Sequence, residues 1–118
     1  MQPEREYIDH LKAGRFAIQR SRSSGRYVFY PRVAEPGTGA RDLEWVEASG
    51  LGTVHAVTVI NPKPPEAPYN VVLVDLDEGP RMMSRVENLA SSDLRIGMRV
   101  KARIVDDQTA PFVVFDPA

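Results

Sequence analysis

The sequence contains no cysteine among its 118 residues, which excludes disulfides, thiolate metal ligands and cysteine nucleophiles. It also lacks an apolar run of the roughly 18 to 20 residues that a membrane-spanning helix needs. The first residues, MQPEREYIDHLKAGR, are charged and contain no apolar signal core. Neither sign of charge dominates, because 15 Lys and Arg stand against 16 Asp and Glu, for a formal net charge of −1. We therefore expect a cytoplasmic protein, and a strongly basic nucleic-acid binder is not indicated.

The chain length and composition predict one compact unit with a single core. A chain of 118 residues corresponds to about one domain, and 42% hydrophobic with 26% charged residues is ordinary for a globular protein. Bulk disorder is not indicated by this composition.

Residues 50–118 have the sequence pattern of an all-β barrel. The clearest strand alternates Met98, Val100, Ala102 and Ile104 with basic residues, so one of its faces is predicted to be core. A serine-capped helical turn that ends at Gly97 precedes this strand. Five strands with a helical turn after the third are typical of an OB fold. The predicted strands are residues 53–60, 69–77, 81–86, 98–104 and 112–115, with a proline-rich loop at 61–68 and a turn at Asp106 and Asp107.

Residues 1–49 predict a small appendage rather than a second core. Residues 3–13 form an amphipathic helix that stops at Gly14. Three short strands follow at residues 16–20, 27–30 and 43–47, with glycine-bearing turns between them. This part is too poor in apolar residues to be stable alone, so we expect it to lean on the barrel or on a partner. The predicted division is 1–14 for the helix, 15–49 for the strand lobe and 50–118 for the OB domain.

No set of residues in the sequence forms a recognisable catalytic constellation. His10 and His55 have no metal-ligand spacing between them. Asp75, Asp77 and Glu78 form an acidic corner, which a solvated strand face explains. We therefore predict that the chain is not an enzyme.

Basic residues are concentrated before residue 35. The span from His10 to Ala34 contains no Asp or Glu. Its cations are compatible with coenzyme A phosphates, with single-stranded nucleic acid, with an acidic partner, or with a merely solvated surface. The cations of this span are Lys12, Arg15, Arg20, Arg22, Arg26 and Arg32, and a second basic row follows at Arg99, Lys101 and Arg103.

Taken together, several segments carry a family resemblance over nearly the whole chain. They are the N-terminal helix, FAIQRSRSSGRYVFYPR, DLEWVEASGLGTVHAVTVI, VVLVDLDEGPRMMSRV and DLRIGMRVKARI. In this order they resemble the zinc-ribbon plus OB-fold proteins, a domain-of-unknown-function family that accompanies thiolase-like and hydratase-like acyl-CoA enzymes. The resemblance implies a rubredoxin-like ribbon lobe at residues 15–49.

The sequence departs from the family at the zinc site. The resemblance implies two Cys-x-x-Cys turns, each followed by glycine, and the matching positions here are Ser21 and Ser24, then Glu35 and Thr38. Hydroxyls are poor zinc ligands, and one glutamate does not replace four thiolates. We therefore predict a degenerate, metal-free ribbon whose turns are held by hydrogen bonds and packing.

The function that the resemblance implies is non-catalytic. The chain would bind a thiolase-like, aldolase-like or hydratase-like acyl-CoA enzyme and help to shape its acyl-CoA site, with acyl-CoA as a shared ligand and no cofactor of its own. The alternatives are a single-stranded nucleic-acid-binding OB protein and a stand-alone acyl-CoA-binding protein. The candidate partner contacts are Tyr7, Ile8, Leu11, Phe29 and Tyr30, and the candidate contacts to coenzyme A phosphates are Arg20, Arg22 and Arg26.

Overall fold

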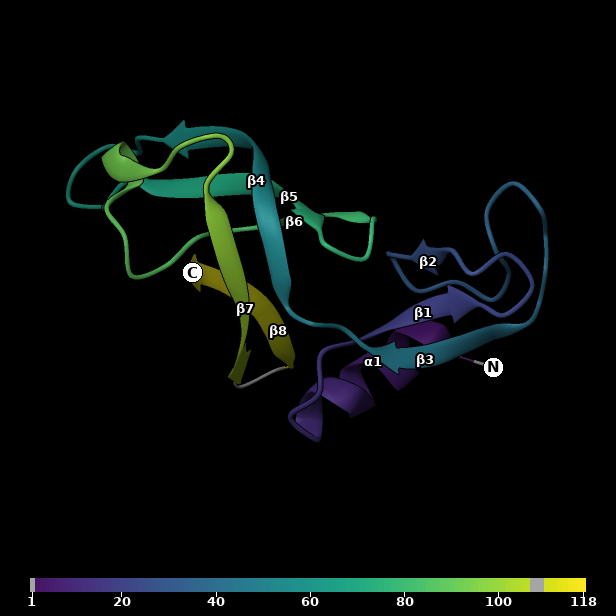
Figure 1. The fold of residues 1–118 in the computed structure, drawn as a ribbon. Helices are drawn as coiled ribbons and strands as arrows, with labels where there is room; N and C mark the ends of the chain where they lie inside the picture. The colour runs from purple at the N-terminus through teal and green to yellow at the C-terminus, as the bar shows by residue number, and fades with distance from the viewer. Residues whose placement is uncertain (1, 107–109) are drawn as a thin grey trace.

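The computed structural model describes residues 2–106 and 110–118 of the chain. A single α-helix stands at the N-terminal end of this part, and the other regular elements are strands and one short 3-10 turn (Figure 1). Among these residues no helix is long and apolar enough to cross a membrane. The elements in order are α1 (Pro3–Lys12), β1 (Ala17–Ser21), β2 (Tyr27–Val28), β3 (Leu43–Glu47), β4 (Leu51–Ile60), β5 (Tyr69–Leu76), β6 (Arg81–Ser84), the 3-10 turn η1 (Ser91–Asp93), β7 (Arg99–Asp106) and β8 (Pro111–Pro117).

Helix α1 packs on a small antiparallel sheet with strand order β2-β1-β3. Pro3 occupies the first helical turn, where its missing N–H costs nothing, and Glu4 and Glu6 complement the positive end of the helix dipole. Tyr7 and Leu11 lie one turn apart on the same face, and both are buried. The helix is therefore fixed by its apolar stripe.

The larger sheet has the order β6-β5-β4-β7-β8, and every neighbouring pair of strands is antiparallel. It curls into the open barrel at the left of Figure 1. Strand β4 changes register between Val54 and Ala56, and such a bulge bends a strand. Gly52 allows close packing there, since a Cβ at this position would lie 2.6 Å from Val74 Cγ1. The mainly β, OB-type architecture predicted from the sequence is confirmed.

One continuous core joins the helix, the small sheet and the barrel. Tyr7 and Leu11 of the helix and Phe16 and Ile18 of the small sheet belong to the same buried cluster as Phe115 of the barrel. The N-terminal part leans on the barrel, as its thin apolar content predicts.

Two details differ from the predictions made along the chain, and a third is not fully covered by the described residues. The strand predicted at residues 27–30 is paired only at Tyr27 and Val28. The serine cap of η1 is absent, because the Ser91 hydroxyl accepts a hydrogen bond from Asn70 Nδ2 at 3.3 Å instead. The turn predicted at Asp106 and Asp107 lies partly outside the described residues.

Candidate functional site

The barrel has a seam between its two edge strands, β6 and β8, which run parallel to each other. The seam is closed at one end by a bridge between Val86 and Phe115. There the Phe115 N–H donates to the Arg85 carbonyl at 3.0 Å, and the Glu87 N–H donates to the Phe115 carbonyl at 2.8 Å. Within the described residues no strand pairing joins β6 itself to β8. The other end of the seam is therefore open.

A groove of about 520 Å³ lies over the open end of the seam. Helix α1 and the segment after β2 form one wall, and strands β6 and β8 form the other. The lining is mostly apolar, so the groove combines surfaces from the ribbon lobe and from the barrel. Its residues are Tyr7, Ile8, Phe29, Tyr30, Arg32, Arg81, Met82, Met83, Pro111, Phe112 and Val113.

A second hollow of about 410 Å³ continues the groove along the barrel. It shares Met83, Phe112 and Val113 with the first hollow and extends to Tyr69. We call the two hollows together the seam groove. Met83 is 69% exposed, Tyr69 50% and Tyr30 49%. A contiguous apolar surface of this kind typically marks an interaction site.

The charged side chains that line the seam groove are all arginines. Arg81 is ion-paired with Asp75 at 2.7 Å, outside the groove lining. Arg85 lies over the Phe112 ring, 5.2 Å from its centroid, and is ion-paired with Glu87. For Arg32, no side-chain ion pair occurs in the part of the chain that the structure describes. The rim therefore favours an apolar ligand surface that carries negative charge.

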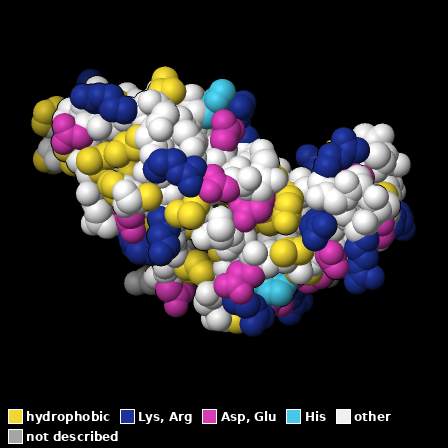
Figure 2. Space-filling view, viewed as in Figure 1, with side chains coloured by type: hydrophobic (Ala, Val, Ile, Leu, Met, Phe, Trp, Pro, Cys, Tyr) yellow, Lys and Arg dark blue, Asp and Glu magenta, His cyan; other side chains and the backbone are white. Residues whose placement is uncertain are grey.

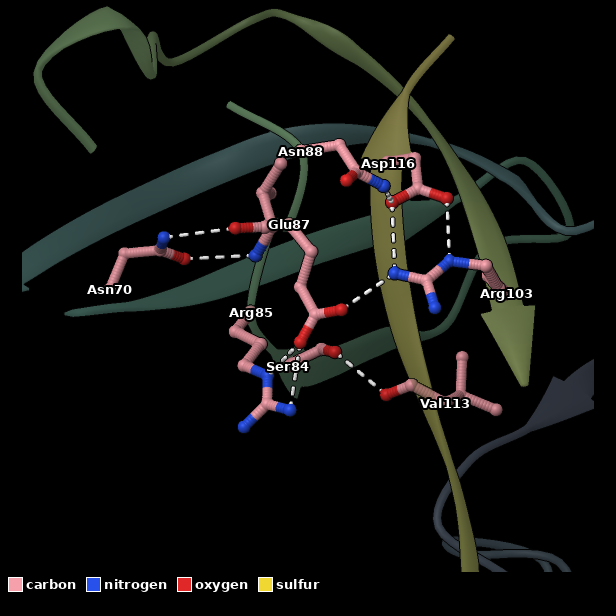
Figure 3. A network of polar contacts seen from close by, with 9 residues as sticks. Asn70, Ser84, Arg85, Glu87, Asn88, Arg103, Val113 and Asp116 are labelled. Carbon is pink, nitrogen blue, oxygen red and sulfur yellow. Dashed lines mark hydrogen bonds and ion pairs between the residues drawn. The ribbon is translucent and has the colours of Figure 1, made fainter. Parts of the chain in front are cut away.

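A polar clamp holds the closed end of the seam (Figure 3). Asn70 Nδ2 donates to the Val86 carbonyl at 3.0 Å, and the Val86 N–H donates to Asn70 Oδ1 at 2.9 Å. Arg103 of β7 donates to Asp116 of the neighbouring β8 at 2.8 Å and, across the seam, to Glu87 at 2.6 Å. These hydrogen bonds from Arg103 lower the pKa of both carboxyl groups below their usual range.

The basic row on β7 is largely neutralised. Arg99 makes two hydrogen bonds to the Asp77 carboxylate, at 2.7 and 2.8 Å, and Arg103 is paired as described above. The acidic corner is likewise occupied by ion pairs, because Asp75 binds Arg81. On the face drawn in Figure 2, basic and acidic side chains are interspersed over the barrel. This row is therefore poorly suited to a phosphate backbone.

The structure brings four of the five predicted partner contacts into the seam groove: Tyr7, Ile8, Phe29 and Tyr30. Leu11 lies in the core instead, and Tyr7 is also mostly buried, which raises the pKa of its hydroxyl. Tyr30 is the well-exposed member of the set. Contact of these residues with a partner stays a prediction.

Sequence reasoning missed Met83, Phe112 and Tyr69 as groove residues. The adjacent Met82 and Met83 gave a signal, because neighbouring residues on a strand face opposite sides and one of the two had to point outward. Met82 is buried and Met83 is exposed.

The three arginines predicted to contact coenzyme A phosphates each have a partner within the chain. Arg22 pairs with Glu44 at 3.1 Å, and Arg26 with Glu35 at 3.3 Å. Arg20 lies over the Tyr27 ring, 5.7 Å from its centroid. A role of these arginines in binding coenzyme A stays a prediction.

The four positions that match the family's zinc ligands lie close together in the ribbon lobe. Ser24 Oγ donates to Glu35 Oε2 at 2.6 Å, and Thr38 Oγ1 donates to Glu35 Oε1 at 2.6 Å. The Ser24 N–H donates to Ser21 Oγ at 3.3 Å. Three hydroxyls and one carboxylate do not make a zinc donor set. In the described residues no group of three or more His, Cys, Asp or Glu side chains is placed to hold a metal ion.

Comparison with known proteins finds similarity to an enoyl-CoA hydratase subunit and to DUF35 scaffold proteins. A "Probable enoyl-CoA hydratase alpha subunit" of Thermomonospora curvata is 32% identical over 116 residues, which are 95% of this chain and 36% of that protein. A "DUF35 domain-containing scaffold protein" of Pyrococcus furiosus is 30% identical over 66% of this chain and 60% of its own length. This chain therefore spans about a third of the first relative and three fifths of the second.

A solved structure described as "Ltp2-ChsH2(DUF35) aldolase" superposes with a TM-score of 0.85 at 30% identity, covering 99% of this chain and 95% of that one. The family model for the "ChsH2, C-terminal OB-fold domain" matches residues 45–105. The names of the scaffold relatives agree with the prediction that the chain is not an enzyme. The family resemblance seen in the sequence is confirmed: the chain belongs to the DUF35 family and contains the ChsH2-type C-terminal OB-fold domain.

Proposed function

We propose that this chain is a non-catalytic accessory unit of an acyl-CoA enzyme and docks on it through the seam groove. The relatives named as hydratase alpha subunits, and the structure named as an aldolase with a DUF35 component, support an accessory role beside such enzymes. A thiolase-like, aldolase-like or hydratase-like subunit is the partner class that this role requires.

The observation that carries the proposal is the uncovered apolar surface from Tyr30 over Met83 to Tyr69. Three large apolar side chains so close together cost solubility in an isolated chain, and a partner surface removes this cost. The arginines at the rim of the groove add a second requirement, which is negative charge on the partner surface. The partner surface is apolar at its centre and carries Asp or Glu at its edge, opposite Arg32 and Arg85.

The shaping of an acyl-CoA site is the finer part of the proposal. The ribbon lobe contributes Arg20, Arg22 and Arg26, whose guanidinium groups suit the phosphates of coenzyme A. Arg22 is held by Glu44 in an exposed pair, for which a ligand with several phosphate charges competes well, whereas Arg26 is paired with the buried carboxylate of Glu35. The chain supplies no cofactor in this scheme, and acyl-CoA is a ligand shared with the enzyme.

The test uses a tagged chain, a lysate of the native organism and identification of co-purifying proteins by mass spectrometry, followed by reconstitution of the purified pair. Met83→Glu introduces a charge at the centre of the groove. Ile96→Glu is the matched control, because Ile96 is 70% exposed, as Met83 is 69%, but lies outside the groove lining. We expect Met83→Glu to weaken binding of the recovered acyl-CoA enzyme at least about tenfold, while Ile96→Glu leaves it unchanged.

Equal affinities for the two variants would refute docking through the groove. Recovery of nucleic acid without an acyl-CoA enzyme would favour the OB fold's nucleic-acid role. Binding of a coenzyme A thioester by the chain alone, with no enzyme recovered, would indicate a stand-alone acyl-CoA-binding protein.

A further inference from the structure

The ribbon lobe has an anion at the place where a metal ion would sit. The Glu35 side chain is only 3% exposed, and each of its two carboxylate oxygens accepts a hydroxyl hydrogen bond of 2.6 Å. The bond from Ser24 crosses from the first turn to the second, while the bond from Thr38 lies within the second turn. Arg26 Nε, 3.3 Å from Glu35 Oε2, adds a second link between the turns.

A second carboxylate anchors the first turn to the start of β3. Ser21 Oγ donates to Asp42 Oδ1 at 3.1 Å, and the Ser23 N–H donates to Asp42 Oδ2 at 2.7 Å. Hydrogen bonding from the side chain of Ser23 first, and then from the Ser21 hydroxyl and the Ser23 N–H, lowers the pKa of Asp42, so the carboxylate is the form that the turn stabilises.

The two turns keep a tight backbone geometry without a metal. The Gly25 N–H donates to the Ser21 carbonyl at 2.8 Å, and the Gly39 N–H donates to the Glu35 carbonyl at 2.9 Å. Both glycines have positive φ, +76° and +71°, which suits glycine best. The hydroxyl of Ser24 in the first turn and the carboxylate of Glu35 in the second can therefore meet between the two turns.

From this geometry we infer that the Glu35 carboxylate holds the two ribbon turns together in place of a structural metal ion. The central charge is then negative, whereas that of a metal ion is positive. We call this arrangement the carboxylate staple. In a zinc ribbon a central cation attracts anionic ligands, whereas here a central anion attracts O–H and N–H donors. The ribbon consequently folds without metal, and its stability depends on Glu35 and on the hydroxyls of Ser24 and Thr38. This inference does not depend on docking of a partner at the seam groove.

The first measurement is amide hydrogen exchange at Gly25 and Gly39 in the full chain. Glu35→Ala removes the central acceptor, and we expect exchange at least about tenfold faster at both amides. Glu44→Ala is the matched control: Glu44 also pairs with one arginine of the lobe, at 3.1 Å, but among residues 2–106 and 110–118 it accepts no hydroxyl hydrogen bond. Equal exchange in the two variants would overturn the staple. Should Glu35→Ala not fold, Ser24→Ala and Thr38→Val give the same test with one hydroxyl donor to Glu35 removed at a time; each also removes the hydrogen bond that the hydroxyl accepts, from the Arg26 N–H at 3.2 Å and from the Ala40 N–H at 3.3 Å.

The second measurement is metal content and chelator response of the wild-type chain. We expect no stoichiometric zinc by elemental analysis and no change in exchange at Gly25 or Gly39 when EDTA or zinc chloride is added. Stoichiometric zinc, or faster exchange in EDTA, would overturn the inference.

The combined variant S21C/S24C/E35C/T38C restores four thiolates on the same turns, and we expect it to bind one Co²⁺ with thiolate charge-transfer absorption and to become sensitive to chelators. Failure of this variant to bind Co²⁺ would show that the turns do not hold the geometry of a metal site.

Discussion

Removal of the Asn70 side chain should open the closed end of the seam. Asn70 is buried at the start of β5, and its amide satisfies both the N–H and the carbonyl of Val86, at 2.9 and 3.0 Å. Val86 is itself buried and forms the bridge to Phe115 on β8. In Asn70→Ala both backbone groups lose their partner, and each buried unsatisfied group costs about 1–3 kcal/mol. We therefore expect a loss of about 2–5 kcal/mol in the free energy of unfolding.

Urea unfolding followed by circular dichroism measures this loss, with Asn61→Ala as the control. Asn61 is exposed and takes part in no side-chain hydrogen bond within the described residues, so its replacement should change stability by no more than about 0.5 kcal/mol. Hydrogen exchange localises the effect, since the Phe115 amide donates across the seam and should exchange faster in Asn70→Ala. A loss under about 1 kcal/mol, or unchanged exchange at Phe115, would refute the clamp.

Two further substitutions test the barrel. Gly52→Ala places a Cβ 2.6 Å from Val74 Cγ1, so we expect overpacking of about 1–3 kcal/mol by urea unfolding, and an unchanged midpoint would contradict the close packing at this strand. Arg103→Met tests the carboxylates of the clamp. Arg103 lowers the pKa of Asp116 and of Glu87 in the folded state. The stability that these two carboxylates contribute is therefore fully present above their unfolded-state pKa values and is lost as the pH falls through their folded-state pKa values. The variant should lose stability at pH 7 and depend less on pH below about 4, and a pH profile parallel to that of the wild type would contradict this assignment.

Local sequence patterns predicted the strands, because the alternation of buried and exposed side chains along a strand can be recognised from neighbouring residues alone. The alternation of Val100 with Arg99 and Lys101 fixes both the strand and its buried face, and the structure agrees. The positions of Ser24 and Glu35 in the ribbon turns came from the family resemblance, which implies a Cys-x-x-Cys turn at each place. The signal for the strand lies within a few residues of the chain.

Features that depend on strand order were not predictable in the same way. Arg99 suggested a phosphate-binding row, yet its guanidinium reaches over β4, donating to Thr53 Oγ1 at 3.0 Å, and binds Asp77 at the end of β5. The sequence places Arg99 and Asp77 on different strands and does not say that only β4 separates them. The seam groove depends in the same way on Tyr30, from the segment after β2, and on Met83 of β6.

Met83 belongs to neither of the two polar networks, which separates its contribution to the binding surface from the stability of the fold. Asn70 closes the barrel at Val86, and Glu35 holds the ribbon turns, while Met83 lines the groove between these two parts with most of its side chain in solvent. A side chain that is already exposed contributes little burial to folding, so its replacement changes the free energy of unfolding only slightly. A loss of partner binding in Met83→Glu can therefore be assigned to the interface, provided that its unfolding midpoint matches that of Ile96→Glu.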